Sequence, residues 1–289
     1  MKTLITAIAT TATLLFIQSC STLPNAEEPS TAVSAEQHLT QTGNHEGHSM
    51  NDAGETKTNT AIQAKLTVPK TVAVNASIPL LINIQDATGK PIDKFDVSHE
   101  QLMHLIVVSD DLQFFDHLHP RYDGNGRFTV KAQLPRAVGY TLFSDYKPTG
   151  QPAQVSTLKT QVPGDSASSL DVNFKRSQTF TNTKVNLELP TETVKAGEEV
   201  AVTFNLKSLN NQPVTDLQPY MGEQGHLVIL RQSASLTSAD YIHAHAIKGT
   251  TLGKVQFVTS FPKPGLYKLW GQFNRNGEIV TADFWVKAN

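Results

Sequence analysis

From about Ile62 onward, short runs of β-branched and aromatic residues alternate with clusters of turn-forming residues. Segments such as Ala87-Thr88-Gly89-Lys90-Pro91 and Asp123-Gly124-Asn125-Gly126 predict turns between them. Seven short strands with little helical periodicity favour an antiparallel β-sandwich of about a hundred residues. In the first half the strands are predicted near residues 62–68, 77–84, 102–109, 114–119, 127–134, 139–146 and 154–162.

The second half repeats this plan, and the order of the repeated motifs predicts a duplication. The offset between the copies is 122 for the first two motifs, 126 for the third and 127 for the fourth, so it changes only at loops. The four pairs are Gly89-Lys90-Pro91-Ile92 with Asn211-Gln212-Pro213-Val214, His104-Leu105-Ile106-Val107-Val108 with His226-Leu227-Val228-Ile229-Leu230, His117-Leu118-His119 with His243-Ala244-His245, and Tyr140-Thr141-Leu142-Phe143 with Tyr267-Lys268-Leu269-Trp270.

The chain before the first strand has a different character. Residues 1–19 carry a positive Lys2 and then an apolar stretch too short for a membrane span, which predicts a signal peptide. The stretch ends in Ile17-Gln18-Ser19-Cys20, which resembles the lipobox of bacterial lipoproteins, although Gln18 departs from it. Cys20 is the only cysteine in the chain and is therefore predicted to be a lipid attachment point; the alternative is a free thiol.

These features divide the chain into four predicted parts. They are the signal peptide, a polar and disordered tether over 20–60, and two immunoglobulin-like β-sandwiches over 61–165 and 175–289. The fold class is therefore all-β. The sandwiches are expected to fold separately, with the polar stretch near Gly164 at their boundary.

Charge narrows the choice of partners. The chain has 24 Lys plus Arg and 26 Asp plus Glu, with no dense basic run, which argues against nucleic acid as a partner.

The predicted location is the cell envelope, as a membrane-anchored lipoprotein that faces the periplasm or the exterior. Ser21 is compatible with the outer membrane if the organism is Gram-negative.

Histidine is the residue type with chemical potential. Each copy has one histidine that opens an apolar strand and a His-x-His pair in the next strand. Residues two apart on a strand face the same side, so a hairpin brings three imidazoles together. Such a set suits copper or zinc. The two predicted clusters are His104, His117 and His119, and His226, His243 and His245.

Methionines near these motifs add soft thioether ligands, which favour Cu(I). Met103 and Met221 are candidate ligands, although Met103 points away from His104 if its strand is regular. The tether adds His45, His48 and Met50 as auxiliary ligands, or it is a polar spacer that happens to hold histidines. His99 has no counterpart in the second copy and is expected to be a loop residue.

The sequence resembles the bacterial secreted proteins and lipoproteins with one or two immunoglobulin-like (YtkA-like) domains, often linked to copper or heavy-metal handling. The resemblance covers Lys65 to Val286. It implies the sandwich fold and an envelope location, and more weakly metal binding. Ala246 stands where the first copy has Pro120. The motifs run from His104 through His117-Leu118-His119-Pro120 and from Tyr220-Met221-Gly222 through His243-Ala244-His245.

Three functions stay open at this point. The first is an envelope lipoprotein that binds copper, or else zinc, for buffering or for delivery to a metal-transport or resistance protein. The second is a structural or adhesion module whose histidines belong to the fold. The third is a zinc hydrolase, with Asp116 or Glu223 as base; neither has a counterpart in the other copy, so no catalytic role is assigned and the chain is not expected to be an enzyme.

Overall fold

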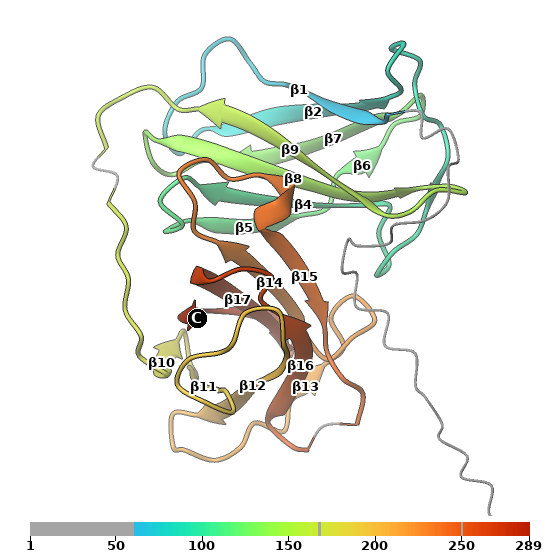
Figure 1. The fold of residues 1–289 in the computed structure, drawn as a ribbon. Coiled ribbons are helices and arrows are strands. Elements are labelled where there is room, and N and C mark those ends of the chain that lie inside the picture. The colour runs from blue at the N-terminus through green and yellow to red at the C-terminus, as the bar shows by residue number, and fades with distance from the viewer. Residues whose placement is uncertain (1–60, 167–168, 250) are drawn as a thin grey trace, which may run out of the picture. The chain divides into compact units, whose positions relative to one another are not determined.

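The computed structural model describes residues 61–166, 169–249 and 251–289, which form two antiparallel β-sandwiches (Figure 1). The predicted all-β, immunoglobulin-like fold class is confirmed. In the first sandwich, one sheet has the strand order β1-β2-β7-β6 and the other has β3-β8-β4-β5 with β9 beside β8. The strands are β1 (Gln63–Thr67), β2 (Ser77–Gln85), β3 (Phe95–Asp96), β4 (Met103–Ser109), β5 (Phe115–Leu118), β6 (Arg121–Tyr122), β7 (Arg127–Gln133), β8 (Gly139–Pro148) and β9 (Gln154–Gln161).

The second sandwich has the same plan. Its sheets have the orders β10-β11-β12-β16 and β13-β17-β14-β15, with β18 beside β17. The strands are β10 (Ser177–Phe180), β11 (Thr183–Glu188), β12 (Glu199–Ser208), β13 (Leu217–Gln218), β14 (His226–Arg231), β15 (Tyr241–His245), β16 (Lys254–Ser260), β17 (Gly265–Arg275) and β18 (Glu278–Ala288). A short 3₁₀ helix, Ser238–Asp240, precedes β15.

Each sandwich has its own core and a matching corner. Alternate residues of β2 (Ile78, Leu80 and others) point into the first core, as the period of a half-buried strand requires. At the start of β8 the Tyr140 hydroxyl donates to the carbonyl of Arg136, 3.0 Å away. At the start of β17 the Tyr267 hydroxyl donates to the carbonyl of Lys263, 2.7 Å away. Both resemble the tyrosine corner of immunoglobulin-like sandwiches.

The central strands β4 and β14 are buried on both faces. One face of β4, with Leu105 and Val107, lies in the first sandwich's core, and the other face, with Ile106 and Val108, does not. That second face belongs to a third hydrophobic cluster, which combines Ile106, Val108, Leu112 and Phe143 of the first sandwich with Val228, Leu230, Leu236, Trp270 and Trp285 of the second. The two sandwiches therefore pack against each other through their five-stranded sheets.

The contact between the sandwiches is nearly two-fold symmetric. The ring of Phe115 stacks on Trp270 with centroids 4.9 Å apart, and Tyr241 stacks on Phe143 at 5.1 Å. Phe115 and Tyr241 are the first residues of corresponding strands, and Phe143 and Trp270 are partners in the fourth repeated motif. Separate folding of the two units stays a prediction, and the shared cluster shows that the folded sandwiches also pack against each other.

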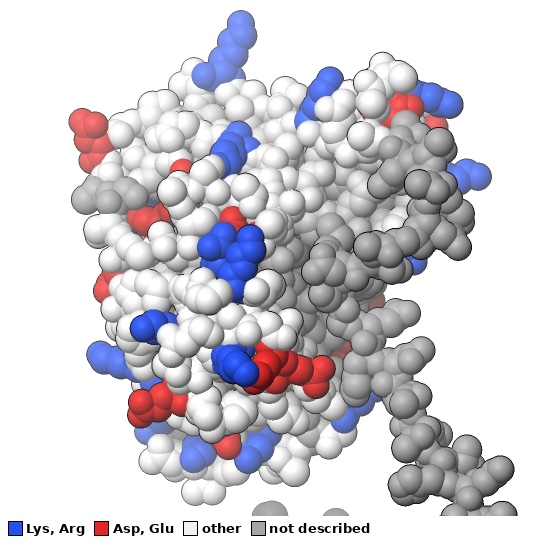
Figure 2. Space-filling view, in the orientation of Figure 1, with Lys and Arg blue, Asp and Glu red and all other residues white. Residues whose placement is uncertain are grey.

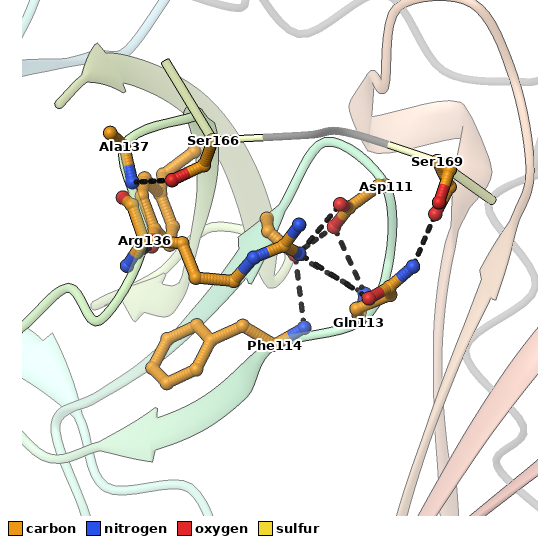
Figure 3. A network of polar contacts seen from close by, with 9 residues as sticks. Asp111, Gln113, Phe114, Arg136, Ala137, Ser166 and Ser169 are labelled. Carbon is orange, nitrogen blue, oxygen red and sulfur yellow. Dashed lines mark hydrogen bonds and ion pairs between the residues drawn. The ribbon is translucent and has the colours of Figure 1, made fainter. Parts of the chain in front are cut away.

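The segment between the sandwiches is tied to both of them. Figure 3 shows the backbone N–H of Ala137 donating to Ser166 Oγ and the amide of Gln113 donating to the carbonyl of Ser169. Beside them Arg136 pairs with the buried carboxylate of Asp111 at 2.6 Å. On the other side, the indole N–H of Trp285 donates to the carbonyl of Asp171. These bonds hold the connection to the sandwiches at both ends.

The surface is chemically mixed. On the face in Figure 2, basic and acidic side chains are interspersed with uncharged surface, as the near balance of 24 and 26 charges would lead one to expect. In the part of the chain that the structure describes, no helix has the length and apolar character to cross a bilayer.

Candidate metal centre

All seven histidines of the described residues gather where the two sandwiches meet. Both predicted triads lie on the sheet faces that form the contact between sandwiches, and the rings of one triad contact those of the other. His104, His117 and His226 are buried, and the other four histidines are half-buried. The seven are His99, His104, His117, His119, His226, His243 and His245.

In the first triad, the hairpin of β4 and β5 sets the positions. His117 lies opposite Ile106 in the strand register, so His119 extends the register toward His104. His104 and His117 are buried, with 2% and 9% of their surface exposed, and His119 is half-buried. One ring nitrogen from each of the three lies within 4.8 Å of the others. The predicted convergence of the first cluster is therefore present in the structure.

Hydrogen bonds determine which nitrogens carry protons. His104 Nε2 lies 3.0 Å from the carbonyl oxygen of Ser98, which can only accept, so Nε2 is the protonated nitrogen. Gln272 directs its amide N–H toward Thr281 and its Oε1 toward His117 Nδ1, 2.7 Å away, so that Nδ1 donates. The other two nitrogens, His104 Nδ1 and His117 Nε2, then face each other at 3.1 Å with a lone pair on each.

Two facing lone pairs repel unless a cation lies between or beside them. A proton could serve, but it would create a buried imidazolium, and burial lowers the pKa of His104 to about 4. Burial also holds the pKa of His117 well below its usual range and lowers the pKa of His119. Two nitrogens bound to one tetrahedral metal ion lie about 3.3 Å apart. The first triad is thus neutral, convergent and spaced as ligands are.

The second triad has the same frame with different partners. His226 lies directly opposite His245, and His243 opposite Val228. His243 Nε2 faces His226 Nδ1 at 3.1 Å, as in the first copy. His243 Nδ1, however, lies 3.2 Å from the carboxylate of Asp145, where His117 has the amide of Gln272. His226 Nε2 is buried and has no hydrogen-bond partner, so the proton of His226 can sit on Nδ1 and bond to His243.

The two triads are in ring contact across the interface. The rings of His104 and His226 have centroids 5.9 Å apart, and those of His117 and His226 are 5.7 Å apart. His104 is also 5.8 Å from His243. Each copy therefore contributes to one continuous imidazole cluster rather than to a separate surface site.

His99 is the ligand candidate that the sequence reasoning missed. Its ring stacks on His245 at 4.1 Å and lies 5.6 Å from His226, both in the other copy. The residue is in a tight turn with a φ of 47°, and Met221 occupies the corresponding turn with a φ of 53°. Positions 99 and 221 are 122 apart, the offset of the first two motifs. That offset was the available signal.

Two partners of the histidines were also missed, Asp145 and Gln272. They lie 127 apart, like the fourth motif, and each pairs in register with the opening histidine of its own copy. Each then hydrogen-bonds to a histidine of the other copy. Neither residue belongs to a recognisable motif, so only the repeat offset could have indicated them.

The remaining predicted residues are dispersed. Met103 lies in the core of the first sandwich, on the face of β4 opposite to His104, and Met221 is buried in its turn. Asp116 alternates with Phe115 and His117 and therefore points away from the imidazoles; burial raises its pKa. Glu223 closes the turn that contains Met221. Cys20 and the tether residues His45, His48 and Met50 lie outside the described residues.

The comparisons with known proteins define a class. Residues 57–163 and 178–289 match the domain of unknown function DUF8832, and the chain belongs to that family, with two copies of the domain. No curated protein matches the chain.

Two solved structures show low similarity to the chain. The first is the Escherichia coli adhesin FdeC, at 15% identity and a TM-score of 0.25, with 78% of this chain and 64% of that chain covered. The chain thus spans less than two thirds of that adhesin chain. The second is a segment of two fibronectin type III domains from chicken tenascin, at 12% identity and a TM-score of 0.23, with 77% and 97% covered.

Proposed function

We propose that this tandem β-sandwich protein binds a transition metal ion, copper in the first instance and zinc as the alternative, at the imidazole cluster between its sandwiches. The established part is the fold, a duplicated immunoglobulin-like module. The metal function rests on one observation above all, the 3.1 Å approach of His104 Nδ1 and His117 Nε2 with both protons directed elsewhere.

The ligand chemistry narrows the metal. Imidazole suits copper and zinc, whereas magnesium and calcium require oxygen ligands. His104 and His117 are buried, and hydrogen bonds to Ser98 and Gln272 hold their rings in place. Such outer hydrogen bonds orient metal-binding histidines and raise their basicity. The cluster contains no thiolate, because the only cysteine of the chain is Cys20. Buffering or delivery of the ion fits this site better than electron transfer at a blue-copper centre, which requires a cysteine ligand.

The test removes ligands from the first triad. In a mature chain whose tether residues His45, His48 and Met50 are alanine, His117→Ala with His119→Ala should lower Cu(I) affinity by more than about 100-fold, because loss of an outer-shell partner alone costs about 10–100-fold. Competition with a chromophoric Cu(I) chelator measures the affinity. The control is Lys131→Ala with Gln133→Ala, an exposed pair of the same spacing on β7.

Equal affinity in the double variant and the control would reject the first triad as the site. If the double variant fails to give the circular dichroism spectrum of a β-sandwich, His119→Gln replaces it, since His119 is the half-buried member of the triad. A loss of at least about 10-fold is then expected.

The location and partners belong to the same proposal. We expect an envelope lipoprotein, acylated at Cys20 and tethered to a membrane, that exchanges its ion with a metal-transport or resistance protein. The auxiliary ligands His45, His48 and Met50 would capture ions in the tether. Mass spectrometry of the membrane fraction should show a lipid on Cys20; a soluble mature chain that starts elsewhere would contradict the anchor.

The competing function is a structural or adhesion module. The adhesin and fibronectin-type neighbours fit that alternative better than they fit metal binding. It predicts that histidine variants change stability and leave metal retention unchanged. A zinc hydrolase has less support, because Asp116 points away from the imidazoles. We assign no catalytic residue.

A further inference from the structure

We propose that the second triad is a second metal position, different in kind from the first and completed by residues of the first sandwich. His99 serves as a ligand beside His226, His243 and His245, and Asp145 positions His243 and supplies negative charge. This position takes a divalent ion, whereas the first triad takes Cu(I). The inference rests on the proposed function, since it divides one imidazole cluster into two unlike halves.

The first observation is the reach of His99 across the interface. Its ring centroid lies 4.1 Å from that of His245, 5.6 Å from His226 and 5.7 Å from His243. It is farther, at 6.1 Å, from His104 in its own copy. The four rings His99, His226, His243 and His245 therefore form one set drawn from both sandwiches.

The second observation is the exchange of an amide for a carboxylate. His117 donates to neutral Gln272, and His243 donates to Asp145. Tyr241 adds a weaker contact, with its hydroxyl 3.4 Å from the same oxygen. A carboxylate–histidine–metal arrangement is typical of Zn²⁺ sites.

The charge balance separates the two halves. A divalent ion on four neutral imidazoles keeps a charge of +2, and the mostly buried Asp145, with 19% of its side chain exposed, offsets half of it. The first half has only the neutral amide of Gln272 beside it. A monovalent ion is easier to hold there, because a buried charge without a partner is costly.

The turn at Met221, which corresponds to the turn that bears His99, adds to the difference between the two halves of the cluster. Met221 is buried in that turn, and the two turns approach each other, since a Cβ on Gly222 would lie 3.7 Å from Glu100 Oε1. From the two-fold relation we expect the Met221 turn to face the first triad as His99 faces the second, and a thioether favours Cu(I) over zinc.

The experiment titrates two probes in sequence. The mature chain with its tether ligands replaced by alanine is first loaded with one equivalent of Cu(I) under anaerobic conditions, and Zn²⁺ is then added in competition with a chromophoric zinc chelator. This Cu(I)-loaded parent chain, called wild type below, should bind one further Zn²⁺. His99→Asn should lower that Zn²⁺ affinity by at least about 10-fold and leave Cu(I) affinity unchanged; asparagine is chosen because it tolerates a positive φ.

Two further variants exchange the charge. Asp145→Asn should lower Zn²⁺ affinity by about 10-fold or more. Gln272→Glu, which places a carboxylate beside His117, should allow Zn²⁺ to compete with Cu(I) at the first triad. Ser98→Ala is the control for the turn, because only the backbone carbonyl of Ser98 contacts the cluster.

The possible failures are distinct. If Cu(I)-loaded wild type binds no Zn²⁺, or if His99→Asn binds it as tightly as wild type and Ser98→Ala do, this inference is overturned while Cu(I) binding stands. If Cu(I) affinity is the same with and without His117 and His119, the proposed function itself fails. Zn²⁺ binding by the His117→Ala, His119→Ala variant would still support a second position.

Discussion

The two halves of the histidine cluster are built on one frame and satisfied in different ways. In each half the first residue of the His-x-His pair directs Nε2 at the Nδ1 of the opening histidine, with a separation of 3.1 Å. In the first half, hydrogen bonds to Ser98 and Gln272 hold the protons of His104 and His117 on the nitrogens that face away from this gap. In the second half, Nε2 of His226 has no hydrogen-bond partner, so the proton of His226 can sit on Nδ1, which faces the gap. The two His-x-His motifs therefore differ in how strongly a cation would stabilise the gap. The difference arises because the hydrogen-bond partners outside the motifs are not the same.

The halves should be most alike in their apolar contacts. Trp270→Ala removes the stack on Phe115, and Phe143→Ala removes the stack on Tyr241. Both residues are fully or nearly fully buried in the shared cluster, so each change should reduce the free energy of unfolding by about 3–5 kcal/mol. Urea unfolding measures this. A large loss for one and none for the other would contradict a shared, two-fold interface.

The metal-free protein should lose stability in acid because its histidines are buried as neutral rings. The pKa of His104 falls from 6.5 to about 4 on folding, so the unfolded chain binds its proton first as pH falls. The contribution of His104 is complete above pH 6.5 and is lost between about 6.5 and 4; its full size is about 3 kcal/mol. The buried imidazoles of His117 and His226 act in the same direction.

Unfolding measured from pH 7.5 to 4.5 tests this, with His104→Gln as the comparison. The variant should show a flatter dependence on pH than the parent. Equal slopes would mean that His104 is not buried as a neutral group. A bound metal ion should move the loss of stability to lower pH, since it competes with protons for the same nitrogens.

The smallest expected effect is a difference in stability between His243→Ala and His117→Ala, which arises from the charge of Asp145. His243→Ala leaves the carboxylate of Asp145 with only the weak contact of Tyr241, and His117→Ala leaves the neutral amide of Gln272 without its partner. Hydrogen bonds to charged groups contribute about 1.5–3 kcal/mol and neutral ones about 1 kcal/mol. His243→Ala should therefore be more destabilising by about 1 kcal/mol at pH 7 in the metal-free protein. A smaller loss than that of His117→Ala would contradict an ionised Asp145.

The sequence predicted the longer strands of the first sandwich and the duplication. It also predicted that His104, His117 and His119 lie close together, because a period of two places His117 and His119 on one face. It did not predict the contact between the sandwiches. The runs His104–Val108 and His226–Leu230 are continuously apolar after the histidine rather than alternating, which is typical of strands buried on both faces. The roles of His99, Asp145 and Gln272 could not follow from motifs, since each acts on a histidine of the other copy.

The central claim, that one copper ion binds His104, His117 and His119 beneath the second sandwich, is tested most directly by a crystal structure of the copper-loaded mature chain with anomalous data at the copper edge. An anomalous peak is expected about 2.0–2.1 Å from His104 Nδ1 and His117 Nε2, inside the contact between the sandwiches. Copper found only elsewhere on the chain, with those two nitrogens still facing each other unoccupied, would contradict it.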